Sequence, residues 1–139
     1  MIDPLETVIN YLKRDTVLMQ MISNRIATKW QSDWLPDAPC ILIRPDGGTP
    51  DIDVPHQRIG VDIRCHAASH NGAMAIWRQV ADLARASKRA VVSTSSGDAI
   101  LYFLNQAGGP TFLYDPELGA DFVLCLFAAD VSETSPNPS

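Results

Sequence analysis

The alternation of apolar and polar residues from Arg58 to Ala67 predicts a strand with one buried face. The apolar positions share one side and the polar positions the other: Ile59, Val61, Ile63, Cys65 and Ala67 against Arg58, Asp62, Arg64 and His66. From Asn71 to Lys88 the apolar spacing changes to three and four residues, which predicts an amphipathic helix with Trp77 in its buried stripe. A half-exposed strand that leads into such a helix indicates a sheet with a helix laid on one face.

The first third of the chain predicts helices followed by a strand. Asp3 can cap a helix whose first position suits Pro4, and an apolar stripe then runs to Leu12. A new apolar set begins after Asp15, so the helix either kinks there or gives way to a second short helix capped by this residue. Residues 31–39 carry aspartates and prolines and predict a loop, and residues 40–44 predict a strand.

The remaining strands are separated by two irregular segments. Residues 45–55 and 106–119 are rich in Gly and Pro and predict long loops of the kind that often carry function. Residues 90–92 and 99–104 predict a hairpin that turns at 95–98. Residues 121–129 are apolar on both faces, which indicates a central strand or one covered by a partner subunit.

These elements predict the α+β class, with a mainly antiparallel sheet and two helices packed on one face. The 139 residues contain no repeat and no linker, so we expect a single domain over residues 1–131. The last residues, 132–139, hold two prolines and no apolar side chain, and we expect a disordered tail.

Charge and cysteine usage narrow the classes of function. A net charge of −5 disfavours a surface that grips duplex DNA, because such affinity comes from Lys and Arg on phosphates. Cys40, Cys65 and Cys125 lie in apolar runs without paired spacing, which indicates buried free thiols in a reducing compartment. We expect an intracellular protein, since the start lacks a signal-peptide pattern and no apolar run approaches about 20 residues.

No catalytic, metal or cofactor site is predicted. Cys65 and His66 are adjacent on a strand and so point to opposite faces, which prevents them from sharing a metal with His70. A buried thiol beside two surface imidazoles is the plainer interpretation. Cys125 lies between two leucines in mid-strand, where no substrate could approach a nucleophile. The glycine pairs 47–48 and 108–109 lack the spacing of phosphate-binding loops and predict turns.

The sequence also predicts residues that contact a partner molecule. Trp34 lies in a polar loop, where it either contacts a partner or packs locally over the helices. The acidic side chains of residues 45–55 either belong to an ordinary solvated loop or form an acidic wall, along which a negatively charged molecule passes without binding. The predicted contact residues, drawn from these loops, are Trp34, Asp46, Asp51, Asp53, His56, Tyr114, Asp115 and Glu117.

The layout over residues 3–130 resembles the tail terminator (tail completion) proteins of long-tailed bacteriophages and phage-like particles. The similarity rests on five features: the apolar stripe of Pro4–Leu12, the step Asn24-Arg25-Ile26, the strand Pro39–Ile43, the strand Val61–Ala67 leading into its helix, and the closing strand Asp121–Leu126. It is a pattern of lengths and apolar positions with no catalytic signature, and related neck proteins share much of it.

The resemblance implies a structural subunit of a homohexameric ring, located in the neck of a virion and assembled in the host cytoplasm. Such a ring caps the tail tube and binds the head connector or head-closure protein, and the DNA passes through its lumen unbound. The resemblance implies no enzyme activity and no cofactor. The alternatives are another neck ring, such as a head-closure or stopper protein, or a small enzyme or ligand-binding α+β domain.

Overall fold

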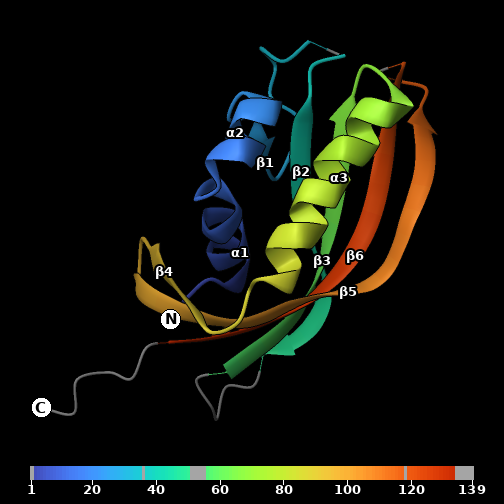
Figure 1. The fold of residues 1–139 in the computed structure, drawn as a ribbon. Coiled ribbons are helices and arrows are strands. Elements are labelled where there is room, and N and C mark those ends of the chain that lie inside the picture. The colour runs from blue at the N-terminus through green and yellow to red at the C-terminus, as the bar shows by residue number, and fades with distance from the viewer. Residues whose placement is uncertain (1, 36, 51–55, 118, 134–139) are drawn as a thin grey trace, which may run out of the picture.

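The computed structural model describes residues 2–35, 37–50, 56–117 and 119–133. Within these ranges the chain forms three helices and six strands, in the order α1 (Pro4–Lys13), α2 (Thr16–Ile22), β1 (Ile26–Ala27), β2 (Cys40–Pro50), β3 (His56–Ala67), α3 (His70–Arg85), β4 (Ala90–Thr94), β5 (Gly97–Asp115) and β6 (Ala120–Glu133) (Figure 1). The strands make one sheet in the order β1-β2-β3-β6-β5-β4. Every neighbouring pair is antiparallel except β1 and β2.

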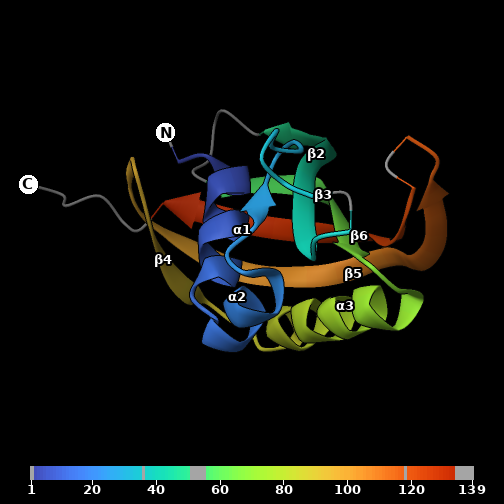
Figure 2. The same cartoon turned by 90° about the horizontal axis from the view of Figure 1, so that it is seen from above.

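The helices all lie on one side of this sheet (Figure 2). The predicted α+β class is confirmed, with three helices in place of the two expected. The additional helix arises at Asp15, whose carboxylate accepts a hydrogen bond from the backbone N–H of Leu18 at 2.8 Å and so caps α2. The sheet curls until β4 reaches α1, where the Asn10 side chain donates to the Ser93 carbonyl at 3.0 Å.

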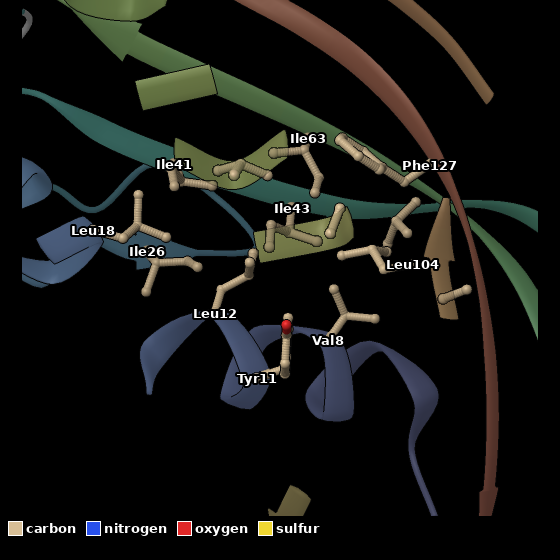
Figure 3. Packing of buried hydrophobic residues seen from close by; sticks show 14 of the residues in the cluster. Val8, Tyr11, Leu12, Leu18, Ile26, Ile41, Ile43, Ile63, Leu104 and Phe127 are labelled. Atoms are coloured by element: carbon tan, nitrogen blue, oxygen red, sulfur yellow. The ribbon is translucent and has the colours of Figure 1, made fainter. Parts of the chain in front are cut away.

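The core lies between the helices and the concave face of the sheet. The alternation in β3 places Val61, Ile63 and Cys65 on this face, each fully buried as predicted. Figure 3 shows apolar side chains from the sheet meeting those of α1 and α2, among them Ile41, Ile43, Ile63, Leu104, Phe127, Val8, Leu12 and Leu18. Helix α3 contributes mainly small residues, and its Trp77 is half-buried against the core.

The first irregular segment is a strand as far as the structure describes it, so the predicted loop at residues 45–50 is wrong. Strand β2 continues to Pro50, with a bulge between Pro45 and Gly48. The bulge is possible because Gly60 lies opposite: a Cβ there would lie 2.5 Å from the Asp46 carbonyl oxygen. Residues 51–55 lie outside the described residues.

The second irregular segment is also a strand. Strand β5 runs to Asp115 and stays paired with β6 through three changes of register. Gly109 takes a positive φ of 89° at one of these irregularities, so the predicted turns at the glycine pairs are bulges within strands.

The apolar strand near the C-terminus is central, as its sequence predicts. Strand β6 pairs with β3 on one side and with β5 on the other. It ends at Glu133, two residues inside the segment expected as a tail, because Ser132 pairs with both His56 and Ile100. Residues 134–139 lie outside the described residues.

Candidate interaction surface

Four rings meet on the helix-free face of the sheet, near the N-terminal end of α3. His66 belongs to the polar side of β3 and stacks on Phe122 of β6 with ring centroids 4.7 Å apart. Trp30 presents an edge-on contact to His66 at 5.7 Å and to Trp34 at 5.5 Å. We call these four residues the aromatic cluster.

The loop between β1 and β2 brings the two tryptophans onto this face. The loop is held at its ends, where Arg25 Nε donates to the Pro39 carbonyl at 2.9 Å. Beneath it Cys40 is fully buried and Leu42 is 5% exposed, although both point away from the main core. His66 is therefore buried at 2% exposure, and the prediction that it is a surface imidazole is wrong. His70 is exposed, as predicted.

The surroundings of His66 favour a neutral ring. Burial is the largest effect and lowers the pKa of His66; the Asp115 carboxylate opposes this, and the Arg64 guanidinium adds to it. Nδ1 has no hydrogen-bond partner within the described residues. His66 therefore serves as an aromatic packing element, and protonating it would bury a charge, offset only in part by Asp115, beneath the loop between β1 and β2.

The end of β5 forms the edge of the sheet beside the cluster. Phe112, Leu113 and Tyr114 are 49%, 40% and 61% exposed, respectively. Leu113 pairs in register with Phe122 and points to the helix-free face. Phe112 and Tyr114 point to the helix-bearing side, where the Phe112 ring lies 4.2 Å from that of His70. Large apolar side chains exposed together in this way mark sites of protein contact.

Leu35, on the loop between β1 and β2, is 69% exposed. It lines, with Trp34 and Arg25, a shallow hollow of about 690 Å³ between the end of α2 and the loop. Of the large apolar side chains that are exposed among the described residues, four of six belong to this loop or to the end of β5. We call the aromatic cluster together with Leu35, Phe112, Leu113 and Tyr114 the aromatic end; it takes in both sides of the sheet at the edge formed by β5. Its acidic residues are Asp33, Asp37, Asp115 and Glu117, and Arg64 lies over the Phe122 ring at 5.6 Å.

The thiols are not placed for chemistry. Burial raises the pKa of Cys40 to about 12 and raises that of Cys65 further. Burial also raises the pKa of Cys125, whose Sγ donates to the Gly108 carbonyl at 3.1 Å. A protonated thiol is a poor nucleophile and a poor metal ligand. In the part of the chain that the structure describes, no three His, Cys, Asp or Glu side chains are grouped to hold a metal ion.

The structure brings half of the predicted contact residues together. Trp34, Tyr114, Asp115 and Glu117 all lie at the aromatic end. Asp46 lies in the bulge of β2, between the paired residues Pro45 and Gly48, and not in the loop where it was predicted. Asp51 and Asp53 lie outside the described residues, and His56 is placed by its backbone as the first residue of β3.

Sequence reasoning missed most residues of the aromatic end. They are Trp30, His66, Phe112 and Phe122, together with Leu35 and Leu113. The three consecutive exposed residues Phe112, Leu113 and Tyr114 were a usable signal, because an apolar, β-favouring triplet is unusual in a loop.

No helix within the described ranges is both long and apolar enough to cross a membrane. No family model and no curated protein matches the sequence. The fold is similar to that of a chain in a solved structure titled "Virion of native gene transfer agent (GTA) particle". The two chains superpose with a TM-score of 0.63 at 18% identity, and the match covers 91% of this chain and 92% of the other. The fold is therefore shared along almost the whole of both chains.

Proposed function

We propose that this protein is a structural component of a phage-like virion and acts there as a tail terminator. It forms a hexameric ring that caps the tail tube and joins it to the head connector. The observation that carries this proposal is the fold shared with a chain of the gene transfer agent particle over nearly its full length. The segment pattern that resembles tail terminators supports the more specific role.

The chemistry of the chain supports assembly over catalysis. Exposed aromatic side chains with an acidic border suit a contact between proteins, because they bury apolar area while the rim sets specificity. The net charge of −5 suits a ring through which DNA slides. The thiols described above are buried and protonated, so they have a packing role and need no substrate.

The proposed role is tested by co-expression with the tail tube protein. Tubes assembled with this protein are expected to have one capped end and a narrow distribution of lengths in negative-stain images. Tubes assembled without it should grow without limit. Uncapped tubes of unlimited length in its presence would contradict the terminator role, and binding to the isolated connector alone would indicate a head-closure ring instead.

The acidic segment provides a separate test of the lumen. Replacing Asp51 and Asp53 with Lys should retain ring formation and reduce DNA delivery, because cations in a channel bind the passing phosphates. Val17→Lys with Gln20→Lys on the exposed side of α2 is the control and should leave delivery unchanged. Unchanged delivery by the double variant would exclude these residues from the lumen.

A further inference from the structure

A second surface, rich in exposed cations, lies at the C-terminal end of α3. We call it the basic patch and define it by Lys13, Arg14, Arg85, Lys88 and Arg89, of which Arg85 forms an ion pair with Asp82 at 3.7 Å. Arg14 Nη1 donates to the Val91 carbonyl at 2.9 Å and so joins the end of α1 to β4. Arg89 lies over the Tyr102 ring at 5.8 Å. The Val91 side chain is 56% exposed and gives the patch an apolar centre.

Helix α3 separates the two surfaces. Its first residue, His70, contacts Phe112 of the aromatic end, and its last residue, Arg85, belongs to the basic patch. A helix of 16 residues is about 24 Å long. Figure 1 shows the same arrangement, with the end of β5 near the start of α3 and β4 beyond its far end. One molecule cannot bring these two surfaces into contact with each other.

We propose that the aromatic end of one copy binds the basic patch of the next copy. This inference rests on the proposed ring and identifies the contact that builds it. Exposed charges of opposite sign can pair across the contact: Asp33, Asp37 and Glu117 border one surface, and Lys13, Lys88 and Arg89 are exposed on the other. Each surface also has an exposed apolar centre, formed by Tyr114 and its neighbours on one and by Val91 on the other. Apolar area then supplies affinity, and opposite charge supplies orientation.

A contact between two different surfaces is heterologous and repeats from copy to copy in one direction. If the rotation that relates neighbouring copies adds up to a full turn, the copies close into a ring; otherwise they form an open filament. All copies in such a ring point the same way, so its two faces differ. That property suits a ring that binds a tube on one face and a connector on the other.

Two double variants test the contact. Tyr114→Ser with Glu117→Lys changes the aromatic end, and Lys88→Glu with Val91→Thr changes the basic patch. All four side chains are exposed, so the fold should survive, and circular dichroism checks this. Each variant alone should sediment as a monomer, because the loss of a central aromatic anchor weakens an interface by about 30-fold or more. An equimolar mixture should form heterodimers and nothing larger, since each partner keeps one intact surface.

Val17→Lys with Gln20→Lys on α2 is the matched control, because it removes one exposed apolar side chain and raises the charge by two, as Tyr114→Ser with Glu117→Lys does. The control should assemble like the wild type, and assembly of both should weaken as salt rises. Double variants that assemble like the wild type, a mixture that stays monomeric, or a wild type that never self-associates would each overturn the inference. Tube capping is measured in parallel. Wild-type and variant proteins that all cap tubes would disprove the contact and leave the terminator role intact.

Discussion

Truncation of Phe127 is the strongest test of where the core lies. The side chain is 1% exposed and sits between β3 and β5, beneath α3. A hollow of about 80 Å³ lies beside it, lined by Ala81, Ala84 and Leu104 and by the exposed residues Arg85, Asn105 and Gln106. Truncation removes the contacts of the phenyl ring with the core and enlarges this hollow. We expect Phe127→Ala to lower the free energy of unfolding by about 3–5 kcal/mol.

Leu126→Ala is the matched comparison on the same strand. Leu126 points to the helix-free face and is half-buried, so its truncation should cost only about 1 kcal/mol. Urea unfolding of dilute protein, followed by circular dichroism, measures both changes, and the slope with denaturant should stay constant. A loss below about 2 kcal/mol for Phe127→Ala, or an equal loss for the two variants, would refute this assignment of the core face.

Three further outcomes follow from the structure. Burial lowers the pKa of His66 below its ordinary value of 6.5, so the unfolded chain takes up this proton first as pH falls. Neutral His66 therefore contributes its full share to the free energy of unfolding above pH 6.5. Below pH 6.5 the free energy of unfolding declines by at most about 1.4 kcal/mol per pH unit from this residue. His66→Phe should remove this decline when unfolding is measured as a function of pH. Cys40 and Cys65 should resist iodoacetamide at about pH 8 and react after unfolding, as measured by mass spectrometry; rapid labelling of the native protein would contradict their burial. Gly60→Ala should cost about 1–3 kcal/mol, because its Cβ meets a backbone oxygen, whereas Gly108→Ala meets ordinary side-chain contacts and should be nearly neutral; equal midpoints in urea would show that the bulge yields freely.

The spacing of apolar residues was sufficient to predict an element that has one solvent-exposed face and one buried face. It identified β3 and α3, and it placed the apolar side of β3 correctly, because burial selects every second residue on a half-exposed strand. Helix capping chemistry was equally local. Asp15 accepts a hydrogen bond from the first turn of α2, as predicted, and Ser69 does the same for α3.

Local reasoning failed where pairing partners are distant in the chain. Residues 45–50 and 106–115 have the composition of loops, yet they complete ladders with β3 and β6 across bulges. The neighbouring strand supplies the hydrogen bonds there, so the glycines are tolerated as irregularities in a ladder. The aromatic end was missed for the same reason. Trp30, His66 and Phe122 meet only through the register of three strands and one loop.

The most direct test of the account is cryo-electron microscopy of the wild-type protein incubated with purified tail tubes. We expect a single ring of six copies at one end of each tube, with the aromatic end of every copy seated on the basic patch of its neighbour. Bare tube ends, with the protein remaining a monomer in the background, would contradict the claim that this chain is built to assemble.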